Sequence, residues 1–366
     1  MRRRAFTAAC ALALLFLCIC PAQALDEPLR EAFDLSGVEQ AVPPEAQQAL
    51  KGAGVDEAAD GGLLQRLLQY AQTQLHTVLR RAVQSMVLIL GAVLLCSVAG
   101  ALCTSEAAAQ YIPLAGTLAI AGAAAGDLSS FLRVGPQTLQ TLSDYSRALL
   151  PCMASAAAVA GSGGAAAAKY AATALFMELL LTAAGWLVMP LVWAHIASVA
   201  ANAALGTDTL SSAASLTRWG ARTAMTALVI AFTAYLSITG VISGAADALT
   251  VRMTKTAVSA ALPVVGGIVS DAASAVAAGA GMVRSTVGVF GLLVVLAVCI
   301  VPFLDLGLRY LLYKAVAGLS LPLCDKRLSG LISGIGSAFG MVLALTGCGA
   351  FFLYFSILSC MGAMTA

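Results

Sequence analysis

Residues 286–303 read TVGVFGLLVVLAVCIVPF, and this stretch decides the class of fold. It holds twelve Leu, Ile, Val or Phe residues and no charged residue. At about −0.3 to −0.6 kcal/mol each, these side chains favour insertion into a bilayer by roughly −4 to −7 kcal/mol. As a helix, the stretch would be about 27 Å long, close to the ~30 Å thickness of the hydrocarbon core. It therefore predicts a transmembrane helix.

The composition of the whole chain agrees with a membrane protein. Of its 366 residues, 60% are hydrophobic and 10% are charged, with a mean hydropathy of +0.92. A soluble domain is about 45–50% apolar and about 25% charged. These values exclude a soluble enzyme and a disordered regulator. No basic patch with interleaved aromatic residues occurs, so nucleic acid is not expected as a partner.

Further apolar stretches predict a polytopic bundle. Strong ones lie at 83–103, 171–189 (continuing past a proline to 200), 224–246 and 335–360. Weaker ones lie at 112–126, 148–162, 262–283 and 308–321. We therefore expect an all-α membrane helix bundle with five to eight spans. The charges of the loops leave its orientation open.

The weak stretch 262–283 is expected to be re-entrant or interfacial. Its seven Leu, Ile or Val residues favour insertion by roughly −2 to −4 kcal/mol, but Asp271 near its middle costs about 2.5 to 3.5 kcal/mol. Pro263 and several glycines weaken a regular span further. Irregular backbone at membrane depth is tolerated where protein surrounds it.

Three regions are predicted along the chain. Residues 1–24 have three arginines, an apolar run and a small-residue cleavage site, which indicate a signal peptide; an uncleaved first helix is the alternative. Residues 25–82 form an external acidic segment and an amphipathic helix, which would lie on the membrane surface or against a partner. Residues 83–366 form the multi-span membrane domain.

A tandem repeat with a period of 112 residues is also predicted. Pro151 and Pro263 are separated by this interval, and so are Pro190 and Pro302. Proline-interrupted segments in two halves are typical of a transport or binding site between repeats. The alternative is coincidence in a chain rich in Ala, Leu and Val.

Charged residues in or beside apolar stretches are candidates for function, because charge at membrane depth is costly. These are Glu178, Asp271, Arg284 and Asp305. The alternative for each is a structural ion pair or a place in a wet groove. Arg309 and Lys314 are expected to extend to the headgroup layer instead.

Glycines spaced four apart favour close helix packing in lipid. The candidate pairs are Gly122 with Gly126, Gly240 with Gly244, Gly330 with Gly334, and Gly336 with Gly340.

Sequence motifs for catalysis are missing. The chain has two histidines in different segments, no phosphate-binding loop and no nucleophile elbow. No C-x-x-C pair occurs, so no zinc site is indicated. We therefore expect no enzymatic activity, no cofactor and no metal.

The chain resembles the stage III sporulation protein AE family of endospore-forming bacteria over about residues 83–360. The resemblance is carried by a leader, an acidic external segment, the order of spans, the stretch from Leu249 to Gly291 with its LPVVGG and STVGVFG segments, and Met189-Pro190-Leu191. The Ala-rich stretch 154–174 departs from the family pattern. The family offers no established catalytic residues to carry over.

The resemblance implies a mother-cell membrane protein that faces the forespore. Its partners would be the other membrane proteins of the stage III A complex, a forespore-side partner and membrane lipid. The protein would then be a permease-like conduit or platform in a channel or secretion-like apparatus. An autonomous secondary transporter of a small solute and a purely structural scaffold are the alternatives.

Overall fold

The computed structural model describes residues 39–51, 62–103, 111–157, 163–205, 210–261 and 266–362. Side-chain surroundings are described over the same ranges, apart from 239–261, 266–285 and a few positions beside the other gaps. The predicted signal peptide lies outside the described residues.

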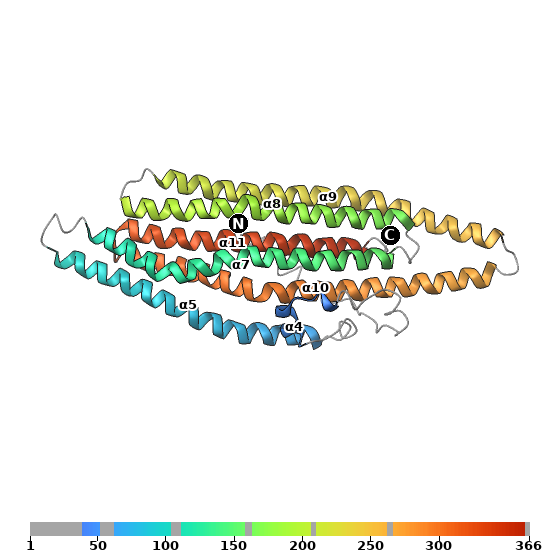
Figure 1. Cartoon of the computed structure of the whole chain (residues 1–366), viewed down its shortest axis with the longest axis horizontal. Coiled ribbons are helices and arrows are strands. Elements are labelled where there is room, and N and C mark those ends of the chain that lie inside the picture. The colour runs from blue at the N-terminus through green and yellow to red at the C-terminus, as the bar shows by residue number, and fades with distance from the viewer. Residues whose placement is uncertain are drawn as a thin grey trace.

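The described part of the chain is entirely helical. Its helices are α4 (Pro44–Leu50), α5 (Gly62–Leu102), α7 (Ile112–Ala157), α8 (Gly163–Leu205), α9 (Ser211–Ala261), α10 (Gly266–Ser320) and α11 (Lys326–Gly362). The six long helices run side by side along one axis (Figure 1). The expected all-α class is therefore confirmed.

Six of the described helices are long and apolar enough to cross a membrane, which agrees with the predicted five to eight spans. They are Gln65–Leu102, Ile112–Met153, Ala171–Leu205, Ser211–Ile238, Thr286–Ser320 and Lys326–Leu358. The weak stretch 112–126 is the first part of the longer candidate span Ile112–Met153. The stretches at 148–162 and 308–321 form no span of their own where they are described, because they include the ends of α7 and α10.

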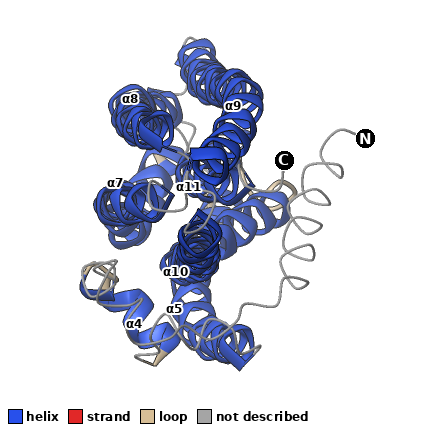
Figure 2. Cartoon of the chain, turned by 90° about the vertical axis from the view of Figure 1, so that its right-hand side faces the viewer, coloured by secondary structure: helices blue, strands red, loops and turns tan. Residues whose placement is uncertain are grey.

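Helices α10 and α11 form the centre of the bundle. Viewed end-on, α11 lies among α7, α8, α9 and α10 (Figure 2). The most apolar windows of the α10 and α11 spans are 61% and 50% buried within the protein, compared with 17% for those of α5 and α9. Lipid accommodates the outer faces, where Leu88, Leu95 and Trp186 are exposed. The apolar run 286–303 is thus largely buried against neighbouring helices, although its composition suits contact with lipid equally well.

Residues 266–283 of the stretch predicted to be re-entrant or interfacial are helical rather than irregular. These residues are the first part of α10, continuous with the span that begins at Thr286. A helix bonds its own backbone groups internally, and this stretch is rich in alanine, the strongest helix former. Together with the end of α9, it extends beyond the other helices (Figure 1).

Helix α5 joins the predicted amphipathic helix to the first span. Leu63, Leu67 and Val78 pack into the bundle, whereas Leu68 and Leu75 are exposed. The apolar residues of the predicted amphipathic helix are therefore divided between the protein core and the outer surface.

The 112-residue repeat stays a prediction. Pro151, Pro190 and Pro302 lie within α7, α8 and α10. Pro263 lies outside the described residues.

Candidate functional site

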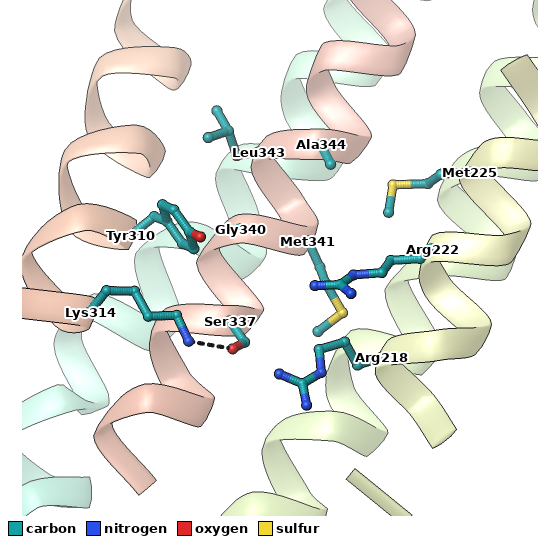
Figure 3. Close-up of a pocket in the computed structure, with 10 residues that line it drawn as sticks. All are labelled: Arg218, Arg222, Met225, Tyr310, Lys314, Ser337, Gly340, Met341, Leu343 and Ala344. Carbon is teal, nitrogen blue, oxygen red and sulfur yellow. Dashed lines mark hydrogen bonds between the residues drawn. The ribbon is translucent and has the colours of Figure 1, made fainter. Parts of the chain in front are cut away.

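Two groups of charged side chains stand out within the described part of the bundle. The first lines a cavity of about 300 Å³ between α9, α10 and α11. Figure 3 shows Arg218 and Arg222 reaching towards α11 from one side and Lys314 from the other. The Lys314 ammonium donates hydrogen bonds to the Ser333 carbonyl at 2.8 Å, the Ser333 hydroxyl at 2.9 Å and the Ser337 hydroxyl at 2.8 Å.

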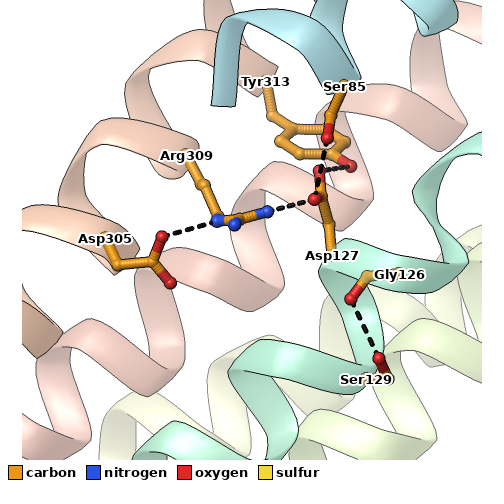
Figure 4. A network of polar contacts seen from close by, with 7 residues as sticks. All are labelled: Ser85, Gly126, Asp127, Ser129, Asp305, Arg309 and Tyr313. Carbon is orange, nitrogen blue, oxygen red and sulfur yellow. Dashed lines mark hydrogen bonds and ion pairs between the residues drawn. The ribbon is translucent and has the colours of Figure 1, made fainter. Parts of the chain in front are cut away.

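The second group forms a buried ion network that joins α5, α7 and α10 (Figure 4). Arg309 forms an ion pair with Asp127 and donates from Nε to the Asp305 carboxylate at 2.8 Å. Asp127 also accepts hydrogen bonds from the Ser85 hydroxyl at 2.9 Å and the Tyr313 hydroxyl at 3.0 Å. The side chains of Arg309 and Asp127 are 8% and 7% exposed. We call these five residues the Asp127 network.

Helical spacing explains the α10 side of this network. Asp305, Arg309 and Tyr313 follow one another at intervals of four residues, which places them on one face of the helix. That face is turned towards α7 and α5, and Asp127 and Ser85 meet it there. The carboxylate of Asp127 thus links its own helix, α7, to α5 and to α10.

Pairing makes burial of these charges tolerable. An unpaired ion in a medium of low dielectric constant is very costly, whereas a pair with further hydrogen bonds recovers much of that cost. Asp127 has three donors, and Arg309 has a carboxylate on each side. The arrangement is suited to fixing the rotation and depth of three helices in lipid.

Arg309 does not extend to the outer surface of the bundle as predicted. Its side chain is turned into the bundle towards Asp127, because a long basic side chain extends to the surface only where the protein offers it no acceptors. The Lys314 side chain is turned onto α11, where two serines accept its hydrogen bonds, and its place at the headgroup layer stays a prediction.

The four predicted charged residues lie in different surroundings. Asp305 belongs to the Asp127 network. Glu178 of α8 forms a two-bond ion pair with Arg147 of α7 at the outer surface, where the side chains are 37% and 55% exposed. The side chains of Asp271 and Arg284 lie outside the described residues. The structure therefore does not bring the four candidates together into one described site.

Asp127 is the central residue that sequence reasoning missed. It directly follows the apolar stretch 112–126, and no basic residue lies three or four positions away on its own helix. An acid in that setting requires a partner from another helix. This signal was present in the sequence, but it does not identify the partner.

The predicted glycines are only partly used for packing. A Cβ on Gly334 would overlap Val199 of α8, and one on Gly340 would lie 2.9 Å from the Tyr310 ring. A Cβ on Gly336 would lie 3.0 Å from the Tyr313 Cβ. A Cβ on Gly122, Gly126 or Gly330 would have no neighbour within 4 Å, and the surroundings of Gly240 and Gly244 lie outside the described residues.

Other tightly packed glycines were missed, because they do not belong to G-x-x-x-G pairs singled out in the sequence. A Cβ on Gly135 would lie 2.6 Å from Val342, one on Gly291 2.7 Å from Leu149, and one on Gly116 2.8 Å from the Cys96 sulfur. Close approach depends on which face of a helix meets its neighbour, and the motif alone does not specify that face.

Comparison with known proteins places the chain in a biological setting. The model of the family described as stage III sporulation protein AE matches residues 47–364. The curated protein named stage III sporulation protein AE of Bacillus subtilis (strain 168) is 25% identical over 203 residues. That alignment covers 54% of this chain and 50% of the relative, so the chain spans about half the length of the curated protein that it matches. No solved structure matches the chain.

Proposed function

Because the chain belongs to the stage III sporulation protein AE family, we propose that it is a membrane subunit of the apparatus linking mother cell and forespore during endospore development. The observation that carries this proposal is the family match over residues 47–364. Six candidate spans support a multi-pass protein. The proposed site of action is the mother-cell membrane that faces the forespore.

We assign the chain a non-enzymatic role as a platform or as part of a conduit. The centre of the described bundle is filled with side chains: the Phe339 ring lies 4.5 Å from the Phe131 ring and 5.2 Å from the Tyr313 ring, measured between centroids. Close packing of this kind leaves no room for a solute within that layer. A conduit would therefore be formed between subunits, with the other stage III A membrane proteins and a forespore-side partner contributing to its wall.

The proposal is tested by deleting the gene in its host. We expect spore development to stop after engulfment begins, with loss of heat-resistant spores and their recovery when the wild-type gene is restored. Affinity purification from sporulating cells in mild detergent should recover other membrane proteins of the complex. An unrelated tagged polytopic protein is the control. Normal sporulation of the deletion strain would refute the proposal.

An autonomous secondary transporter is the second candidate, and the Asp127 network is the observation that favours it. Buried ion pairs within a membrane are frequent in transport pathways. Proteoliposomes that contain only this chain would then move a solute, and Asp127→Asn would abolish the movement. Proteoliposomes that move no solute, together with the co-purification of partner proteins, would support the subunit and not the autonomous transporter.

Cys324, in the turn between α10 and α11, provides a test of orientation. Burial raises the pKa of this thiol; a hydrogen bond from Ser329 lowers it, and the charge of Asp325 raises it. Because the thiolate is the reactive form, we expect slow maleimide labelling near neutral pH and acceleration at a higher pH than for an ordinary cysteine.

The measurement uses a membrane-impermeant maleimide and a variant that retains only Cys324. Labelling of intact spheroplasts or of inverted vesicles identifies the side on which the turn lies. Asp325→Asn should accelerate labelling at each pH, because it removes a charge that opposes the thiolate. A labelling profile equal to that of a free cysteine would contradict the expected shift.

A further inference from the structure

The cavity between α9, α10 and α11 combines three cations with no described acid. Its described wall contains Arg218, Arg222 and Lys314 but no carboxylate. Neither arginine forms an ion pair with a described residue. By contrast, Arg309 on the same α10 helix has a carboxylate on each side. Among the described residues, Arg309 is thus neutralised by the chain's own acids, whereas the cavity cluster has no acidic partner.

Lys314 strengthens the positive field without being a free donor. Its ammonium already has three acceptors on α11, and the charges of Arg218 and Arg222 act on it directly. The guanidinium groups of the two arginines are thus the available donors. Guanidinium presents planar, paired N–H groups that match the oxygens of a phosphate.

The depth of the cluster fits a headgroup. Arg218 lies seven residues after Ser211, where α9 begins, and Lys314 lies six residues before Ser320, where α10 ends. At 1.5 Å per residue, both positions are about 10 Å from the same end of the bundle (Figure 1). The headgroup layers lie outside the ~30 Å hydrocarbon core, at the ends of membrane helices, so the cluster lies near a headgroup layer.

The cavity wall changes from polar to apolar with depth. Along α9 the lining proceeds from Arg218 and Arg222 to Met225, and along α11 from Ser337 to Met341 and then Ala344. In both helices this order leads away from the end of the bundle at which α10 is connected to α11 (Figures 1 and 3). An amphiphile with its phosphate outermost and an acyl chain below it has the same polarity gradient.

We propose that this cavity is a binding site for a phosphate group, supplied by an anionic phospholipid. Arg218 and Arg222 hold the phosphate oxygens, Lys314 contributes charge, and the apolar wall at Met225 and Met341 accepts the start of an acyl chain. Basic pockets between transmembrane helices are suited to anionic headgroups. Bound lipid would join α9 to α10 and α11, and it would stabilise the bundle by binding the folded state.

The test measures the melting temperature of the purified full chain in maltoside detergent during titration with dioleoylphosphatidylglycerol. We expect stabilisation, with half-maximal effect at about tenfold higher lipid for Arg222→Gln and higher still for Arg218→Gln/Arg222→Gln. Arg80→Gln/Arg81→Gln removes the same charge from exposed positions of α5 and should leave the titration unchanged.

Further arms of the experiment identify the source of the phosphate. Dioleoylphosphatidylcholine should stabilise less, because its choline carries a positive charge towards the arginines. If inorganic phosphate alone stabilises the wild-type chain but not the arginine variants, the ligand is a soluble phosphate compound rather than a lipid. Equal titrations for wild type and the cavity variants would overturn the site. If the double variant does not fold, the titrations of Arg222→Gln and of the charge-retaining Arg218→Lys/Arg222→Lys are compared with that of the wild type instead. Equal titrations would again overturn the site.

Discussion

Arg309→Gln is expected to lower the free energy of unfolding by about 3–5 kcal/mol, because it leaves the buried carboxylate of Asp127 without its counter-charge. Asp127→Asn should have a similar effect, since it leaves the Arg309 guanidinium partly unpaired. The double variant retains neutral hydrogen-bonding groups and should recover much of the loss. Denaturant titration in mixed micelles, followed by circular dichroism, gives the coupling energy of the pair.

The control is the same cycle at the exposed pair of Arg147 and Glu178. Solvent-exposed ion pairs contribute little, so Arg147→Gln and Glu178→Gln should be nearly additive. A coupling energy for Asp127 and Arg309 no larger than that of the exposed pair would show that the network does not hold the helices together.

The same variants separate a structural role from a role in transport. If the double variant folds and supports sporulation, the network serves packing alone. If it folds but sporulation fails, the charges themselves are needed. Folding is checked first, by the melting temperature in detergent, so that loss of protein is not mistaken for loss of function.

Gly334→Ala is expected to destabilise the bundle by about 1–3 kcal/mol through overpacking. The added methyl group would lie 2.8 Å from Val199 Cγ2 and 3.0 Å from its Cβ. Rotation of the valine side chain does not move its Cβ, so helices α8 and α11 have to separate. Val199→Ala in the same chain should restore part of the stability. The measurement is again denaturant titration in mixed micelles.

Gly330→Ala is the matched control on the same helix. No atom lies within 4 Å of a Cβ at this position, so the substitution adds no clash. Alanine is the better helix former by up to about 1 kcal/mol, and the variant should be as stable as wild type or slightly more so. Equal losses at positions 330 and 334 would contradict the packing seen between α8 and α11.

Hydropathy predicted the spans well because it sums over neighbouring residues. The stretch 83–103 lies in α5 except for its last residue, and 286–303 lies within α10, as expected. The stretch 112–126 seemed weak because it was judged alone, whereas its helix continues to Ala157 and takes Asp127 into the core. Once Arg309 pairs with that aspartate, much of the cost of burying the charge is recovered.

The sequence by itself determined that this chain is a helical membrane protein. In lipid each backbone polar group must be bonded within the protein, so a long apolar run has few alternatives to a helix. The tertiary structure alone decided that Asp127 binds an arginine 182 positions away, that Gly334 meets Val199, and that three cations surround one cavity. Those contacts depend on the rotation and depth of each helix against its neighbours, and local sequence does not encode these quantities.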